Sequence, residues 1–174
     1  MTVKARHVPD RDSKYMGLAW MMAAFSKDPH TQVGALIVDP LSNIPLGWGY
    51  NGPPKSINDN LLDWSRPNKY DYMLHAEENA IFHTGCVQPL HDCTLYVTQM
   101  PCKRCMLRIG KVRIKRVVYS EPTLKKDSSL NLSAEEKAAV EKLAKECDIT
   151  LNKFYGNLAW IEDWTLRMKA LSVF

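Results

Sequence analysis

Strand-type and helix-type hydrophobic patterns alternate along this chain, and that alternation limits the folds it can adopt. The continuous apolar run Val33–Val38 stops at Asp39–Pro40, and Leu46–Tyr50 is predicted to return beside it as the second arm of a hairpin. Shorter β-type runs follow later in the chain. They predict strands over Thr94–Thr98, Val117–Ser120 and Ile149–Phe154.

Helical patterns separate these strands. Several of them begin or end at a proline, a glycine or a capping box such as Ser133-x-x-Glu136. Strands that alternate with helices favour a sheet covered on both faces, so we expect an α/β fold, a three-layer α/β/α sandwich around a five-stranded mixed sheet. We expect one domain over residues 1–174, with a helical extension from about residue 157. The predicted helices are Ser13–Ser26, His75–Thr84, Pro101–Lys111, Ser133 to about Cys147, and the tail from Leu158.

Composition narrows the function classes. The chain has 174 residues, of which 45% are apolar, and 23 Lys and Arg against 19 Asp and Glu leave a formal charge of +4. A protein that neutralises many phosphates along a duplex is far more basic, so a single phosphorylated small molecule fits better than a nucleic acid. No run approaches the ~20 apolar residues of a membrane helix, and the first residues lack a signal-peptide core. We therefore expect a cytoplasmic protein with no membrane partner.

Cysteine usage points to metal chemistry. The chain has five cysteines at irregular spacings, and an odd number in a chain large enough to bury its own core argues against a disulfide scaffold. Cys102-x-x-Cys105 stands out, because in a reducing cell this spacing indicates a metal site or redox chemistry more often than a disulfide.

His75, Cys102 and Cys105 together form a plausible zinc ligand set. Catalytic zinc takes three protein ligands and keeps one position open, and sulfur and imidazole ligands suit it better than they suit magnesium or calcium. Two cysteines at i and i+3 lie on one face of a helix, and the positive end of the helix dipole favours their thiolate forms. We therefore predict a Zn²⁺ cofactor.

Glu77 follows His75 by two residues and could stand beside the open position of the metal. Zinc lowers the pKa of bound water from about 15.7 to about 7, so a nearby carboxylate can take up a proton and return it to a leaving nitrogen. Zinc nucleobase deaminases carry the signature H-x-E followed by P-C-x-x-C. Here it reads His75-Ala76-Glu77 and Pro101-Cys102-Lys103-Arg104-Cys105.

The chain resembles the cytidine and deoxycytidylate deaminase family. The resemblance is carried by Ser26–Ala35, Gly49–Gly52, Lys69–Glu77 and the segment from Pro101 to Tyr119, which together span most of residues 13–121. It implies hydrolysis of the 4-amino group of deoxycytidine monophosphate to deoxyuridine monophosphate and ammonia. It also implies a homo-oligomer, a hexamer being one form, and makes dCTP and dTTP candidate effectors.

The resemblance also implies roles for particular residues. Asn51 matches the asparagine that hydrogen-bonds the sugar, and the Ala76 backbone matches the group that contacts the pyrimidine edge. Ser26 and Thr31 belong to a segment similar to the phosphate-side loop, and Pro101 is counted with the substrate contacts. The chain departs from the family at Glu78, where leucine is common, and matches poorly after Thr123.

Other cytosine substrates are an alternative: dCTP, a free nucleoside, or cytosine in a polynucleotide. A polynucleotide deaminase needs a broad basic groove with aromatic platforms, and the charge of +4 argues against one. The long loop Gly52–Met73, which holds Trp64, Arg66, Lys69, Tyr70 and Tyr72, instead resembles a lid over a small ligand.

A second alternative belongs to another class. His83-x-x-Cys86 with Cys102-x-x-Cys105 has the spacing of a closed structural zinc module that binds nucleic acid. That interpretation leaves Glu77 without a role, and zinc content in a Cys86→Ser protein separates the two. Asn51, likewise, could merely form a hairpin turn with Gly52.

Overall fold

The computed structural model describes residues 8–85, 90–121 and 132–171. Five strands form one sheet in the order β2-β1-β3-β4-β5. The pairs β1–β2 and β1–β3 are antiparallel, whereas β3–β4 and β4–β5 are parallel. The predicted five-stranded mixed sheet is therefore confirmed. The strands are β1 Gly34–Val38, β2 Pro45–Tyr50, β3 Thr94–Val97, β4 Arg116–Tyr119 and β5 Thr150–Lys153.

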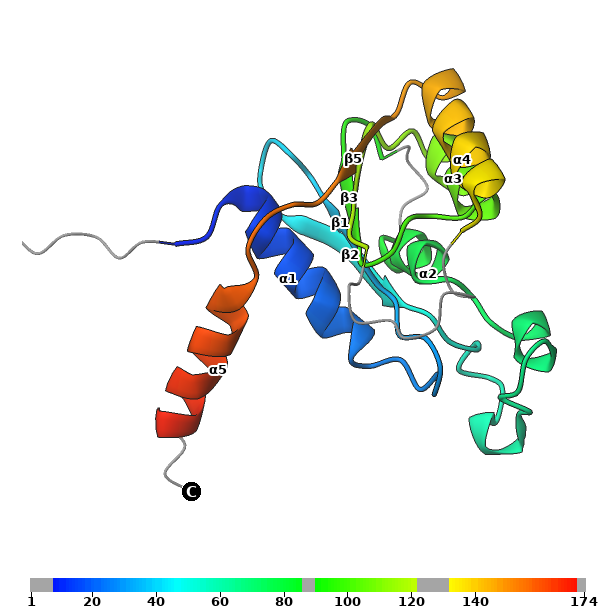
Figure 1. The fold of residues 1–174 in the computed structure, drawn as a ribbon, viewed down its shortest axis with the longest axis horizontal. Coiled ribbons are helices and arrows are strands. Elements are labelled where there is room, and N and C mark those ends of the chain that lie inside the picture. Colours follow the sequence, from blue (N-terminus) through cyan, green and yellow to red (C-terminus); the bar gives the residue numbers. More distant parts are fainter. Residues whose placement is uncertain (1–7, 86–89, 122–131, 172–174) are drawn as a thin grey trace, which may run out of the picture.

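Helices cover both faces of this sheet. In Figure 1, α1 lies on one side, and α2, α3 and α4 lie together on the other. This arrangement is the three-layer α/β/α sandwich that the sequence pattern predicts. The helices are α1 Arg11–Ala23, α2 Ala76–His83, α3 Lys103–Lys111, α4 Ala134–Glu146 and α5 Ala159–Leu171.

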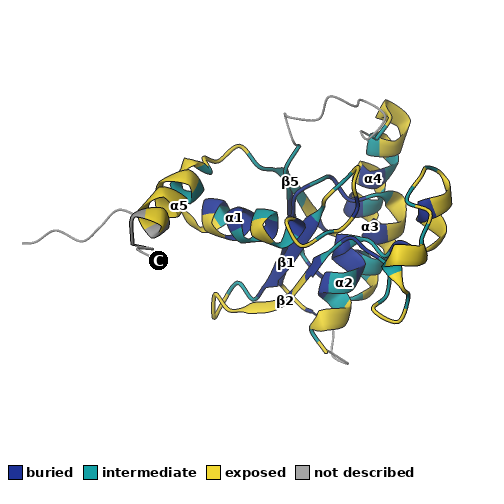
Figure 2. Cartoon of the chain, turned by 90° about the horizontal axis from the view of Figure 1, so that it is seen from below, coloured by how far each residue is buried: buried dark blue, intermediate teal, exposed yellow. Residues whose placement is uncertain are grey.

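The central strand β1 shows why both faces are filled. All five of its residues are buried, and successive side chains of a strand point to opposite faces. Ala35 and Ile37 join the apolar cluster beneath α2, α3 and α4, whereas Leu36 and Val38 join the cluster beneath α1. Figure 2 shows the strand buried between the two helical layers. A continuous apolar run is what such a strand requires.

Glycines of β2 bring α2 close to the sheet. A Cβ atom on Gly47 would collide with the carbonyl oxygen of Ala80, and one on Gly49 would collide with the carbonyl oxygen of Ala76. Because both obstacles are helix backbone, only glycine permits this approach. The start of α2, where His75 stands, is thereby held directly against the sheet.

The loop over residues 52–73 contains two short 3-10 turns, η1 Asp59–Leu61 and η2 Asn68–Asp71. Its two ends are joined, because Gly52 pairs with Leu74 in an isolated antiparallel bridge. The interpretation of Asn51 and Gly52 as a hairpin turn is therefore wrong. The chain instead runs past β2 into the loop and comes back beside Gly52 only at Leu74.

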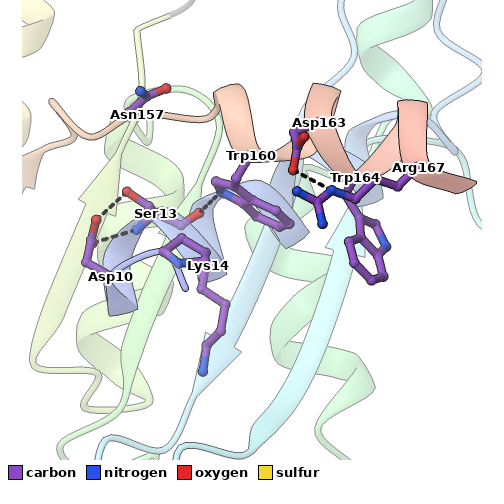
Figure 3. A pocket seen from close by; sticks show the side chains of 9 residues that line it. Asp10, Ser13, Lys14, Asn157, Trp160, Asp163, Trp164 and Arg167 are labelled. Atoms are coloured by element: carbon purple, nitrogen blue, oxygen red, sulfur yellow. Dashed lines mark hydrogen bonds and ion pairs between the residues drawn. The ribbon is translucent and has the colours of Figure 1, made fainter. Parts of the chain in front are cut away.

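The C-terminal helix α5 packs on α1 and leaves much of its own surface exposed (Figure 2). The Trp160 ring contacts Gly17, and its Nε1 donates to the carbonyl oxygen of Ser13 at 3.3 Å. A hollow of about 600 Å³ lies between the two helices (Figure 3), lined partly by Lys14, Trp164 and Arg167.

No helix in the described part of the chain has the length and apolar character needed to cross a bilayer.

Candidate active site

The three predicted metal ligands lie together at the starts of α2 and α3. His75 Nδ1 is 3.6 Å from Cys102 Sγ and 3.3 Å from Cys105 Sγ. The ligand atoms of all three residues lie within 4.8 Å of one another. With Zn–S of about 2.3 Å and Zn–N of about 2.0–2.1 Å, tetrahedral zinc places nitrogen and sulfur about 3.6 Å apart. The group therefore has the spacing and the soft donor set that zinc requires.

Local backbone geometry explains why these side chains converge. His75 is the N-cap of α2 and Cys102 the N-cap of α3, and both have extended backbone dihedrals. Cys105 follows in the first turn of α3, three residues after Cys102, where side chains stand on one face. The helix α3 begins at Lys103, later than the predicted Pro101, because Cys102 occupies the capping position.

The electrostatics of this group favour a thiolate at Cys102. A hydrogen bond from the Cys105 thiol and the nearby His75 imidazolium lower the pKa of Cys102 to about 3. The same thiolate raises the pKa of His75 to about 9. It also raises the pKa of Cys105 well above its usual range, because two adjacent sulfurs do not both ionise without a cation. The cluster is thus arranged to receive a positive ion.

Glu77 is buried in the first turn of α2, with 4% of its surface exposed. Burial raises the pKa of its carboxyl, while the positive His75 ring partly opposes that rise. A carboxyl whose pKa is raised in this way is better able to hold a proton between two transfers than an exposed one. It lines the same cavity as His75 and Cys102.

That cavity has a volume of about 490 Å³, which is within the usual range for a small-molecule site. Of the predicted substrate contacts, Thr31, Asn51 and Ala76 line it. Ser26 and Pro101 are not among the lining residues. The Ser26 hydroxyl instead donates to the carbonyl oxygen of Asn51 at 2.8 Å and so stabilises the backbone of a residue that lines the cavity.

Asn51 organises the neighbouring wall of the cavity. Its Oδ1 accepts from the Val33 amide at 2.7 Å, and its Nδ2 donates to the Thr31 carbonyl at 2.9 Å. Asp28 holds the same loop, because its Oδ1 accepts from the amides of His30 and Thr31 at 2.9 and 3.2 Å. The loop before β1 is therefore fixed by side chains rather than by regular secondary structure.

A buried ion pair between Asp28 and Lys69 forms part of this wall and was not predicted. Lys69 Nζ lies 2.6 Å from Asp28 Oδ2, and each side chain is 3% exposed. Nearby, Arg66 Nη2 donates to Thr31 Oγ1 at 3.3 Å. Lys69 stands in the loop predicted as a lid, but no sequence signal pairs it with Asp28.

Other lining residues that the sequence did not indicate as site residues are Val33, Met73, Gln99, Met100, Arg104, Leu132 and Glu136.

The rival zinc pairing lacks support from His83. This residue ends α2, at the opposite end from His75. Its Nδ1 is 2.7 Å from the Trp48 carbonyl oxygen, and its ring packs on the Trp48 ring at a centroid distance of 4.9 Å. Cys86, its proposed partner, lies outside the described residues.

A first prediction concerns Cys102 after metal removal. Because its pKa is lowered to about 3, chelator-treated protein should carry a Cys102 thiolate throughout the range of about pH 5 to 8. Its alkylation by iodoacetamide, followed by peptide mass mapping, should then vary little with pH, and reloaded zinc should block it. His75→Ala should reduce the reactivity at pH 5. An alkylation rate that rises about tenfold per pH unit up to pH 8 would contradict the proposed charge distribution.

The comparisons with known proteins agree with this geometry. A family model described as the cytidine and deoxycytidylate deaminase zinc-binding region matches residues 9–121. The chain is 36% identical over 146 residues to deoxycytidylate deaminase of Mus musculus, with 80% of this chain and 77% of the relative covered. It is 39% identical over 115 residues to a probable deoxycytidylate deaminase of Caenorhabditis elegans, with 64% of this chain covered. The alignment spans only 57% of that relative's length.

A solved structure supports the fold. The dCMP deaminase of cyanophage S-TIM5, in complex with dCMP and dUMP, superposes with a TM-score of 0.67 over 86% of this chain and 100% of its own. Its sequence identity is 21%, so the likeness concerns the architecture alone. The family match covers most of the chain and includes the His75, Cys102 and Cys105 group together with Glu77. The chain therefore belongs to the cytidine and deoxycytidylate deaminase family, whose zinc-binding region it carries.

Proposed function

We propose that this protein is a zinc-dependent deaminase that hydrolyses deoxycytidine monophosphate to deoxyuridine monophosphate and ammonia. One observation carries the proposal: the buried carboxyl of Glu77 lines the same cavity as His75 and Cys102, two of the three residues of the metal-ligand group. The names of the mouse and worm relatives support deoxycytidylate as the substrate.

In this proposal His75, Cys102 and Cys105 hold the metal. Two sulfurs and one imidazole nitrogen supply three of the four ligands of tetrahedral zinc, which leaves one position for a small molecule. When bound, zinc supplies Lewis acidity that makes water a nucleophile near neutral pH. The starts of α2 and α3 support the arrangement, because helix N-termini stabilise the anionic form of the sulfurs.

Glu77 is assigned the proton transfers. It takes a proton from the water whose oxygen attacks C4 of cytosine, and it gives that proton to N3 as the ring nitrogen gains charge. It then moves a second proton from the new hydroxyl at C4 to the amino nitrogen, which leaves as ammonia while C4 becomes a carbonyl. A buried carboxyl with a raised pKa suits these exchanges, and it neutralises charge that exists only in the transition state.

The cavity walls suggest how the nucleotide is oriented. We assign the pyrimidine to the buried end beside Ala76 and the sugar to the region of Asn51. The phosphate is assigned to the Thr31 end, where the guanidinium of Arg66 approaches the threonine hydroxyl. Ser26 is assigned an indirect role through the Asn51 backbone. Pro101 is also assigned an indirect role, because it lies in the chain between Met100 and Cys102, which both line the cavity.

We also propose that the chain works as one domain in the cytoplasm, with α5 as a helical extension. Apolar clusters on both faces of a single sheet support the one-domain organisation. The four cysteines in the described part of the chain are all free thiols, which is consistent with a reducing compartment.

Substrate choice provides the main test. Ammonia release should be fastest with dCMP when cytidine, dCTP and a cytosine oligonucleotide are compared at equal concentration. The names of the relatives favour dCMP over the other two small molecules, and the cavity of about 490 Å³ is sized for one nucleotide rather than for an oligonucleotide. Repeating the assay at low dCMP with added dCTP or dTTP tests these candidate effectors. Faster turnover of the oligonucleotide, of dCTP or of the free nucleoside would replace the proposed substrate.

A substitution at Glu77 tests the mechanism. Glu77→Gln keeps the size of the side chain but cannot carry the proton, so kcat should fall by about 10²–10⁴-fold while one zinc per chain is retained. Glu135→Gln is the matched control, since this residue lies on the exposed first turn of α4. Zinc content by atomic absorption and ammonia release would be measured on both. Parental turnover in Glu77→Gln would eliminate the assigned role.

We further propose that the protein forms a homo-oligomer through the face shared by β2 and α1. The strand β2 is the last strand on its side of the sheet, and Trp48 and Phe25 are 47% and 62% exposed. An apolar hollow of about 390 Å³ lies between them, also lined by Leu18, Met22 and Tyr50. An exposed apolar face at a sheet edge is typical of an interface.

Sedimentation of the parent and of Trp48→Glu tests this interface. The parent should sediment as an oligomer, whose mass also tests the hexamer, and Trp48→Glu should sediment as a smaller species because a charge would be buried at the contact. A monomeric parent, or an unchanged mass in the variant, would refute the assignment of this face.

A further inference from the structure

Glu78 joins the two helices that carry the metal-ligand group. Its carboxylate is 1% exposed. Oε2 accepts from the backbone amide of His75 at 2.9 Å. Oε1 lies 3.2 Å from Arg104 Nη2 and 2.8 Å from Arg108 Nε on α3. One side chain therefore connects the main chain of one predicted ligand residue to the helix that holds the other two.

The burial of this carboxylate needs an explanation. An isolated buried charge is strongly unfavourable, and it is tolerated where hydrogen bonds and opposite charges surround it. Here two guanidinium groups and one amide supply that environment. The two arginine side chains remain 58% and 39% exposed, so they keep contact with solvent while each guanidinium group binds the acid. The geometry is a polar bridge between α2 and α3 rather than a surface ion pair.

The partners of Glu78 are placed to control ligand spacing. Arg104 lies in the turn between Cys102 and Cys105, and the accepted amide belongs to His75 itself. Arg108 Nη1 also donates to the Arg104 carbonyl at 3.2 Å, which ties the same turn together. A shift of the Glu78 carboxylate would therefore move the imidazole relative to the two sulfurs.

We infer that Glu78 is a positioning residue, which holds His75 at the distance from Cys102 and Cys105 that zinc requires. This inference rests on the proposed zinc site but not on the proposed substrate. It also gives a physical reason for an acid at this position, because Glu78 is matched by basic residues at positions 104 and 108 of the same chain.

The test measures metal retention, not turnover. Glu78→Gln keeps the side-chain volume and a carbonyl acceptor for the His75 amide, but it loses the charge that binds the two arginines. Groups that orient metal ligands typically contribute 10–100-fold to metal affinity. Zinc release into excess chelator should therefore be about tenfold faster than from the parent. Cobalt-substituted protein should show an altered visible absorption spectrum, because its ligand geometry changes.

Asp12→Asn serves as the matched control. The Asp12 carboxylate forms a bidentate ion pair with the Arg116 guanidinium, with N–O distances of 2.9 and 2.6 Å, and accepts a hydrogen bond from the Tyr96 hydroxyl at 2.8 Å. All three contacts lie on the α1 side of the sheet. Its loss should lower stability to urea without changing zinc release. Equal acceleration in both variants would show that general destabilisation, not positioning, explains the effect, and would overturn the inference.

Arg108→Gln keeps the inference testable if Glu78→Gln does not fold. This substitution removes one partner from a half-exposed position on α3, and zinc release should again be faster than from the parent. A parental release rate in a folded Glu78→Gln or Arg108→Gln protein overturns the positioning role. If the parent binds zinc but does not deaminate dCMP, the proposed function fails while these release rates still decide the role of Glu78.

Discussion

The meeting of two helix starts is the constraint on which the rest of this structure depends. The first turns of α2 and α3 leave amides without intrahelical partners, and both face the same small volume. His75 and Cys102 cap these helices, so the polar ends of the helices and the metal-ligand group coincide. The glycines of β2 hold α2 against the sheet, and the parallel strands β3 and β4 carry α3 between them in the chain. The fold thus creates the site by placing two helix ends together.

Local signals were sufficient to predict the strands and to single out the Cys102 and Cys105 pair, whereas His75 was joined to that pair only through the H-x-E and P-C-x-x-C signature. A continuous apolar run such as Val33–Val38 identifies a buried strand without knowledge of its neighbours, and the observed strand begins one residue later, at Gly34. The spacing of Cys102 and Cys105 similarly identifies one helical face. Helix ends were less accurate: α1 begins at Arg11, because the Asp10 side chain accepts from the Ser13 amide and caps the helix there.

Contacts between distant segments could not be predicted in this way. The ion pair of Asp28 with Lys69 joins residues 41 positions apart, and the bridge from Glu78 to Arg104 spans 26. Both depend on how a loop or a second helix packs, and neither leaves a periodic pattern in the sequence. Glu136 illustrates the same limit. The Ser133-x-x-Glu136 spacing predicted its role in the capping box, whereas nothing in the sequence predicted its place on the cavity wall.

The two faces of the sheet carry polar groups of different kinds. On the α1 side, Asp12, Tyr96 and Arg116 form a polar cluster within an apolar layer, and the cavity does not reach them. On the other side, Glu77 and Glu78 are adjacent acids with opposite surroundings. Glu78 forms ion pairs with two arginines and accepts a hydrogen bond from an amide, whereas burial raises the pKa of Glu77. Since the Glu78 carboxylate is bound by two guanidinium groups and an amide while the Glu77 carboxyl faces the cavity, consecutive residues can separate the tasks of fixing the ligands and moving protons.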